Sequence, residues 1–331
     1  MPFTMRKLAI LPAIALMVLP LLACGGGGGD ACAVNVLTPI KAPYLPIVIS
    51  SDLTLGQNRF VVGLIKQDDN SQVLGANLHL RFFRLDSCNK ATLKFESDPS
   101  VIQITKSYVD THPDGTHETH QAGDTGAYVS NVTFDVTGNW GVEVTGATKE
   151  GVKLDPVRLS FPVPATDPGI AIGSPIPPSR QTILSDVSNI RTIDTSLNPI
   201  PEEHGLTVAD AIADGKPTVI AFATPAYCTS LICGPTKDIF DQIYQQYHDQ
   251  ANFIHIEPYD VQKVAAGKCP TLADCTVPAT VDFKLESEPW VFVADAQGVL
   301  RAKFDGIVSE AEMQAALLQV LGASNAPRAV P

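Results

Sequence analysis

The sequence predicts two domains of different class, an all-β domain at about 50–165 and an α/β domain at about 202–323. Three observations support this prediction. The chain has 331 residues, which is enough for two domains of about 100–200 residues each. Short strand-like runs fill the first segment, whereas helical stripes alternate with apolar runs in the second. Between them, the stretch 156–201 holds nine of the 26 prolines, so we expect an extended linker at 166–201.

The first 24 residues have the pattern of an export signal. Arg6 and Lys7 precede the apolar run Leu8–Leu22, which at 15 residues is too short to cross a hydrocarbon core of about 30 Å. The run ends in the letters LLAC at 21–24, and five glycines follow. This ending resembles the lipobox of bacterial lipoproteins, whose cysteine becomes the lipidated first residue. An ordinary cleavable signal is the alternative.

The lipobox resemblance implies a protein held to a membrane by a lipid on Cys24, outside the cytoplasm, on the periplasmic or cell-surface face. Residues 25–49 are then a Gly- and Pro-containing linker, and 324–331 are a short tail. Disulfides persist in that compartment. The formal net charge of −12 gives no attraction to a phosphate backbone, so we expect no nucleic-acid partner.

Short strands follow one another from about 50 to 165. Tyr128, Val132 and Phe134 lie on one face at a period of two residues, and turn sequences such as Pro113-Asp114-Gly115 separate the runs. No long amphipathic helix competes with this pattern. Several strands at such spacing predict an antiparallel sandwich of immunoglobulin type. The expected strands are 59–66, 76–85, 92–96, 101–109, 127–135, 140–144 and 157–163.

From about 204 the pattern changes to alternating helix and strand. The apolar run 218–224 is typical of a strand buried on both faces. Thr207 is the expected N-cap of a first helix, and Ser309 with Glu312 forms a capping box for the last one. We expect helices at 207–214, 237–249 and 309–321, and strands at 218–224, 252–257, 290–294 and 299–304.

The cysteine count fits three disulfides besides the lipidated residue. Six thiols allow 15 pairings, and the simplest set joins each couple within its own region. These couples are Cys32–Cys88, Cys228–Cys233 and Cys269–Cys275. The first and third are expected to be structural disulfides. A metal site made of the four C-terminal cysteines is the alternative, although their spacing is looser than that of zinc-binding pairs.

Cys228 and Cys233 carry the chemistry, because they lie where a buried strand gives way to a helix. A thiol at a helix N-terminus faces unpaired N–H groups, which favour the thiolate. Two residues five apart in one helix are about 8–9 Å apart at Cα, whereas a disulfide needs less than about 7 Å. Proline favours the first helical position, so the helix is expected to begin near Gly234-Pro235, with Cys228 in the loop before it.

The letters CGPTK at 233–237 resemble the thioredoxin active site, Cys-Gly-Pro-Cys-Lys, and the resemblance covers about 202–322. Pro289 looks like the cis-proline that borders the disulfide in that superfamily. The resemblance implies a thioredoxin-like fold, thiol–disulfide oxidoreductase activity at Cys228, Cys233 and Pro289, no cofactor, and extracytoplasmic protein thiols or disulfides as partners. Thr236 replaces the second cysteine of the motif, and Glu288 precedes the proline.

The positions of the two cysteines predict which of them attacks. From its place at the helix start, Cys233 is expected to attack and Cys228 to resolve. Glu257 and Asp260 are candidate bases by location only. Peroxiredoxins of the bacterioferritin-comigratory type also use Cys-x4-Cys, which makes a thiol peroxidase the runner-up. Their motif requires a threonine where this chain has Pro225.

A second signal is a histidine cluster around a tight turn. His112, His117 and His120 surround Pro113-Asp114-Gly115 and are candidate ligands of Cu or Zn. The alternative is a solvated loop. His79 is expected on a strand surface, and His255 in the core or at a sheet edge. A lipoprotein that binds metal or a partner without catalysis, with a structural Cys228–Cys233 pair, is therefore the non-enzymatic alternative.

Overall fold

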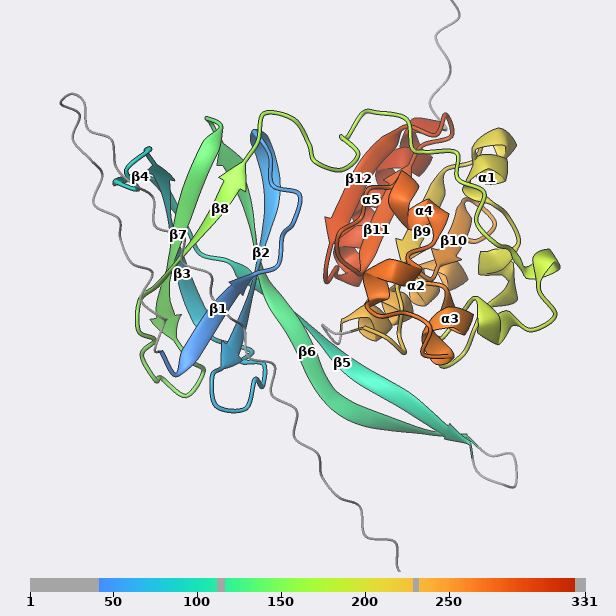
Figure 1. Ribbon diagram of the computed structural model, residues 1–331, viewed down its shortest axis with the longest axis horizontal. Coiled ribbons are helices and arrows are strands. Elements are labelled where there is room, and N and C mark those ends of the chain that lie inside the picture. Colours follow the sequence, from blue (N-terminus) through green and yellow to red (C-terminus); the bar gives the residue numbers. More distant parts are fainter. Residues whose placement is uncertain (1–41, 112–116, 229–231, 325–331) are drawn as a thin grey trace, which may run out of the picture. The chain divides into compact units, whose positions relative to one another are not determined.

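The computed structural model describes residues 42–111, 117–228 and 232–324 (Figure 1). The first part of this chain forms two four-stranded antiparallel sheets, and the second part forms a four-stranded mixed sheet with helices. Within these ranges no helix combines the length and apolar character needed to span a membrane.

The N-terminal sheets have the orders β1-β2-β6-β5 and β4-β3-β7-β8. All seven expected strands are present. An eighth strand, β1, pairs with β2 inside the segment expected to be linker, which corrects the boundary at 49. It carries Pro46, which an edge strand tolerates because one side of its backbone has no ladder partner. The strands are β1 (Tyr44–Val48), β2 (Gly56–Lys66), β3 (Asn77–Leu85), β4 (Ala91–Ser97), β5 (Ser100–Thr111), β6 (His117–Phe134), β7 (Gly138–Ala147) and β8 (Val157–Val163).

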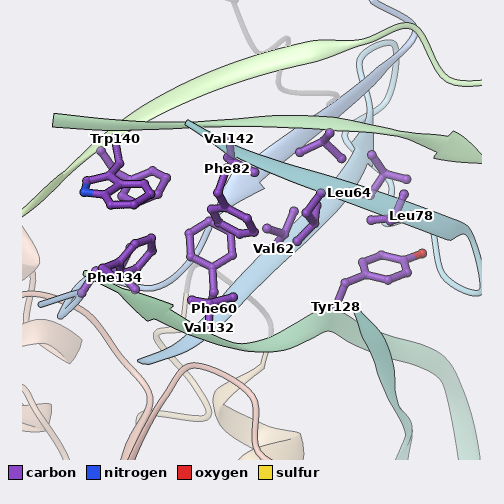
Figure 2. Close-up of a cluster of buried hydrophobic side chains, with 14 of the residues drawn as sticks. Phe60, Val62, Leu64, Leu78, Phe82, Tyr128, Val132, Phe134, Trp140 and Val142 are labelled. Carbon is purple, nitrogen blue, oxygen red and sulfur yellow. The ribbon is translucent and has the colours of Figure 1, made fainter. Parts of the chain in front are cut away.

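The two N-terminal sheets share one apolar core. Figure 2 shows side chains from β2, β3, β6 and β7 pointing into the space between the sheets. The ring centroids of Phe60 and Phe82, from different sheets, are 5.0 Å apart in an edge-to-face arrangement. Trp140 is fully buried, and its indole N–H donates to the Val136 carbonyl oxygen at 2.9 Å. The sheets therefore pack face to face.

Glu143 is a buried carboxylate that joins three strands of the second sheet. It accepts hydrogen bonds from Arg81 on β3 at 2.9 Å and from Arg158 on β8 at 2.7 Å. Burial alone would raise the pKa of Glu143, but the hydrogen bonds from Arg158 and Arg81 lower it below its usual value. A carboxyl with a lowered folded pKa stabilises the fold above its unfolded pKa, and that contribution is lost as the pH falls.

We therefore expect Glu143→Gln to lower the free energy of unfolding of the β domain by about 1 kcal/mol at pH 7, and by much less at about pH 3. Urea unfolding followed by Trp140 fluorescence, in a Trp290→Phe background, measures this difference, since the chain has two tryptophans. An equal loss at both pH values contradicts the ionic role of Glu143.

The C-terminal sheet has the order β10-β9-β11-β12, with β9 parallel to β10 and antiparallel to β11. Residues of β9 alternate between two core clusters: Val219 and Ala221 belong to one, Ile220 and Phe222 to the other. This confirms a strand buried on both faces. The strands are β9 (Thr218–Phe222), β10 (Asn252–Ile256), β11 (Trp290–Ala294) and β12 (Leu300–Asp305).

The helices follow their predicted capping signals. Thr207 accepts from the Asp210 N–H at 3.1 Å, and Ser309 accepts from the Glu312 N–H at 3.2 Å. The short helices α3 and α4 were not expected from the sequence. The helices are α1 (Val208–Asp214), α2 (Cys233–Tyr247), α3 (Val261–Ala265), α4 (Pro278–Asp282) and α5 (Glu310–Ser324).

The proline-rich stretch 166–201 is not a free extended linker, contrary to the expectation. It contains the 3₁₀ helices η1 (Leu184–Asp186) and η2 (Ile190–Thr192), and η3 (Pro201–His204) follows. Ile176 is buried in the same cluster as Val208 and Leu300. Its N–H donates to the Gly298 carbonyl oxygen at 2.9 Å. The stretch therefore packs on the C-terminal sheet and contributes residues to its interior.

Candidate functional site

Cys228 and Cys233 form a disulfide at the beginning of α2. Cys233 is the first residue of the helix, and Cys228 lies in the loop that follows β9. Their Cα atoms are 5.9 Å apart, which is shorter than two helical residues at that spacing allow. The expected arrangement, with Cys228 before the helix, is confirmed, and the pair allows thiol–disulfide chemistry.

The helix start is directed at the sulfur of Cys228. The backbone N–H of Cys233 donates to Cys228 Sγ at 3.2 Å. The N-cap residue Ile232 makes no side-chain capping bond, so this sulfur takes the place of a capping oxygen. A thiolate on Cys228 would therefore also be stabilised by the N-terminus of α2.

The two sulfurs differ in exposure. Cys233 is fully buried, whereas Cys228 is partly exposed. An incoming thiolate reaches the exposed sulfur first, and Cys233 is then the leaving group. The exposure of the oxidised pair thus favours the reverse of the roles expected from the helix position.

Glu288 and the cis peptide bond Glu288–Pro289 border the disulfide. The Glu288 carboxylate lies within 4.8 Å of both sulfurs. Tyr259 donates its hydroxyl hydrogen bond to Glu288 Oε2 at 2.6 Å, which fixes the carboxyl group. Burial raises the pKa of Glu288, and the Tyr259 hydrogen bond opposes that effect. Within that distance, one bridging water can carry a proton between the carboxyl group and either thiol.

Substitution of Glu288 should change the acidity of the neighbouring thiols. A carboxylate this close disfavours a second negative charge, so we expect Glu288→Gln to lower the pKa of the Cys228 thiol in the reduced protein by about one unit. Thiolate absorbance followed against pH in a Cys233→Ser background measures this shift. An unchanged or raised thiol pKa contradicts the placement of Glu288.

The predicted bases lie elsewhere. Among the described residues, Glu288 groups with both sulfurs, whereas Glu257 and Asp260 do not. Asp260 caps α3 by accepting from the Lys263 N–H at 3.0 Å. Glu257 accepts from the N–H and hydroxyl of Thr195 at 2.7 and 2.6 Å. In the sequence, Glu288 stands out as a charged residue before the expected cis-proline, which differs from the thioredoxin pattern. That difference alone does not predict a role as a base.

A buried ion pair supports the first turn of α2. Lys237 is 1% exposed, and its Nζ lies 2.8 Å from Glu203 Oε2 of η3. Lys237 also pairs with Asp241 one turn later. Burial would lower the pKa of Lys237, but the attraction of Glu203 and Asp241 raises it. Lys237 therefore stays charged and joins the cysteine-bearing helix to η3. Sequence reasoning missed this pair because its members meet only in the folded chain.

The remaining cysteines fall in three groups. Cys269 and Cys275 form the expected disulfide, with Cα atoms 5.8 Å apart. The four C-terminal cysteines are thus oxidised in two pairs, which argues against the four-cysteine metal site. Cys24 and Cys32 lie outside the described residues, and Cys88 lies between β3 and β4.

The histidines are distributed differently from the expectation. His112 lies outside the described residues, whereas His117 and His120 lie on β6, opposite Thr111 and Tyr108 of β5. The two described histidines of the predicted loop therefore belong to a strand pair. His79 lies on β3 and is partly exposed, as expected.

His255 is buried on β10, also as expected, and it lies beside Asp194 and His204. No local pattern in the sequence predicts this cluster, because its three members come from separate segments.

No family model matches this chain, and no curated protein matches it. Four chains among the solved structures are weakly similar, and two of them are described here. A thioredoxin-like superfamily protein has 17% identity and a TM-score of 0.27, over 38% of this chain and 88% of that one. MtrC from Shewanella baltica has 8% identity and a TM-score of 0.20, over 40% of this chain and 24% of that one. Neither likeness assigns a family to this chain.

Proposed function

We propose that this protein carries out thiol–disulfide exchange outside the cytoplasm, through Cys228 and Cys233 on a thioredoxin-like domain. One observation carries the proposal: a disulfide joins a partly exposed loop cysteine to the first residue of a helix. The cis bond before Pro289 and the mixed order β10-β9-β11-β12 support the thioredoxin-like assignment. The partners are extracytoplasmic protein thiols or disulfides.

The exchange proceeds in two balanced steps. A partner thiolate attacks Cys228 Sγ, a mixed disulfide forms, and the electron pair of the broken bond leaves on Cys233 Sγ. The α2 N-terminus stabilises that thiolate. A second partner thiol then attacks the mixed disulfide and releases Cys228. The partner dithiol becomes a disulfide, the cysteine pair becomes a dithiol, and Glu288 can hold a proton for the departing thiolates. The reverse reaction follows the same path.

A competition within one chain tests this proposal. Cys269–Cys275 also joins a partly exposed and a buried cysteine, but it has no long helix beginning at it. The oxidised full chain is mixed with a dithiol peptide, quenched, and each pair is counted as thiols by mass spectrometry. We expect Cys228–Cys233 to exchange at least about tenfold faster, because its leaving thiolate is stabilised. Equal rates, or a resistant Cys228–Cys233 bond, contradict the proposal.

We also propose that a lipid on Cys24 anchors the protein to a membrane, on the periplasmic or cell-surface face. The lipobox ending and the glycine tether support this anchor, and the disulfides fit an oxidising compartment. We expect Cys24→Ala to move the protein from the membrane fraction to the soluble fraction. An intact mass without lipid on the mature wild-type chain contradicts the anchor.

The N-terminal domain is proposed as an immunoglobulin-type sandwich. The orders β1-β2-β6-β5 and β4-β3-β7-β8 support this assignment, since they correspond to an ABED sheet facing a CFG sheet with one added strand. Such a domain presents loops at both ends, which suits a partner-docking role beside the redox domain.

A further inference from the structure

Three buried side chains lie close together in the C-terminal domain: Asp194 after η2, His204 at the end of η3, and His255 on the sheet strand β10. Each is at most 3% exposed. His204 Nε2 lies 2.9 Å from Asp194 Oδ2, and His255 Nδ1 lies 3.3 Å from the same oxygen. One ligand atom from each residue lies within 4.8 Å of the other two.

The hydrogen bonds around His255 fix which of its nitrogens is free. Its Nε2 lies 3.0 Å from the Ala223 carbonyl oxygen, which can only accept, so Nε2 carries a proton. In the neutral ring, Nδ1 then presents a lone pair toward the carboxylate of Asp194. Within the described chain this buried nitrogen has no hydrogen-bond partner. Either a proton or a metal ion between His255 Nδ1 and the Asp194 carboxylate would relieve this opposition of two lone pairs.

The spacing suits a metal ion. Zinc binds nitrogen and oxygen ligands at about 2.0–2.1 Å, which puts tetrahedral ligand atoms about 3.3–3.4 Å apart. His255 Nδ1 lies 3.3 Å from Asp194 Oδ2, which matches this spacing. His204 Nε2 is hydrogen-bonded to the same oxygen at 2.9 Å, so it would move away by about 0.4 Å to share a zinc ion with it. The bond from His255 to the Ala223 carbonyl oxygen is the kind of contact that orients a metal-binding imidazole. The other oxygen of Asp194 accepts from the Ser196 N–H at 2.7 Å.

The buried charges also leave room for a divalent cation. Asp194, Glu203 and Glu257 are buried carboxylates around this site, and Lys237 is the buried ammonium that faces them. The buried cluster thus holds more acidic than basic side chains, which favours a bound cation over a bound anion.

A cavity gives access to the remaining coordination position. It has a volume of about 270 Å³, and its lining includes His204, His255 and Glu257 together with the exposed residues Arg180 and Gln262. Among the described residues, Glu257 Oε2 has no hydrogen-bond partner. A water or small anion could therefore complete a tetrahedral site from the cavity side.

We propose that Asp194, His204 and His255 bind one Zn²⁺, with the fourth ligand supplied from this cavity. This site is separate from the thiol exchange at Cys228 and Cys233. It would hold the stretch that carries Asp194 and η3 on β10, and it uses none of the chain's cysteines.

The test uses the full chain with His112, His117 and His120 replaced by alanine and with its disulfides oxidised, so that those groups do not bind metal. Calorimetry with Zn²⁺ and the visible absorption of added Co²⁺ report binding and geometry. We expect one Zn²⁺ per chain and the strong absorption of tetrahedral Co²⁺. Asp194→Asn and His255→Gln should each weaken Zn²⁺ binding at least about 100-fold. The exposed control His248→Gln should leave it unchanged.

The opposite results would overturn the proposal. One such result is that the protein with all three ligands takes up no Zn²⁺. The other is that Asp194→Asn leaves Zn²⁺ uptake unchanged. Nitrogen-15 NMR needs no substitution of a ligand residue, so its result does not depend on whether such variants fold. With Zn²⁺ present, a His255 ring protonated on both nitrogens means that a proton, and not a metal, lies between His255 and Asp194.

Discussion

Cys233→Ser is expected to accumulate a mixed disulfide between Cys228 and partner proteins, whereas Cys228→Ser is expected to trap almost none. Cys228 is the partly exposed sulfur, and it lies 3.2 Å from the Cys233 N–H at the helix start. Once Cys233 is serine, nothing in the pair can resolve the bond that a partner forms with Cys228. Cys233 is fully buried, so a partner cannot reach it directly.

The trap is measured by non-reducing electrophoresis and mass spectrometry of the protein from its own cells. The matched control is Cys269→Ser/Cys275→Ser, which should leave trapping unchanged. Trapping by Cys228→Ser alone would show that Cys233 attacks, as its place at the helix start predicts. A parallel titration of each single variant should find a lowered thiol pKa at Cys228. Trapping by neither variant would contradict the redox role of the pair.

Lys237→Met is expected to lower the free energy of unfolding of the C-terminal domain by about 3–5 kcal/mol. Lys237 is 1% exposed and pairs with Glu203 at 2.8 Å. Methionine is of similar length but leaves the Glu203 carboxylate buried without its partner, and this uncompensated charge is the source of the cost. The reduced and oxidised proteins should both be affected, since the ion pair holds α2 in either state.

The double variant Glu203→Gln/Lys237→Met separates charge from packing. It should recover most of the loss, because it leaves no buried unpaired charge. Urea unfolding followed by Trp290 fluorescence in a Trp140→Phe background measures both variants. A double variant no more stable than Lys237→Met would mean that the lysine acts through packing alone.

Local signals predicted much of the fold. The apolar run of β9, the capping residues Thr207 and Ser309, and the seven expected strands were all visible in the sequence. The strand β1 was missed because it is five residues long and contains Pro46. The stretch 166–201 was misread because its proline content is typical of a linker, whereas its backbone N–H groups find acceptors on the C-terminal sheet.

The sequence predicted only those parts of the site whose residues are close together along the chain. Gly234-Pro235 marked the helix start, and Pro289 marked the cis bond. The roles of the two cysteines depend on the conformation of the loop between β9 and α2. This loop folds back and brings Cys228 Sγ to the Cys233 N–H, and no local sequence pattern predicts that contact. Lys237 and Glu203 lie in segments that are far apart in the sequence, so the spacing of residues along the chain does not predict their contact. Glu288 was visible as an unusual residue, but its distance to the sulfurs was not.

The most direct test of the redox account is the reduction potential of the Cys228–Cys233 bond. Structural disulfides of secreted proteins lie below about −300 mV, and exchangeable ones lie above it. The oxidised full chain is equilibrated with dithiothreitol buffers, and each pair is counted by mass spectrometry. A potential above about −300 mV for Cys228–Cys233, and higher than that of Cys269–Cys275, is the predicted result. A potential far below that value, equal to that of Cys269–Cys275, would show that the pair is an inert structural bond.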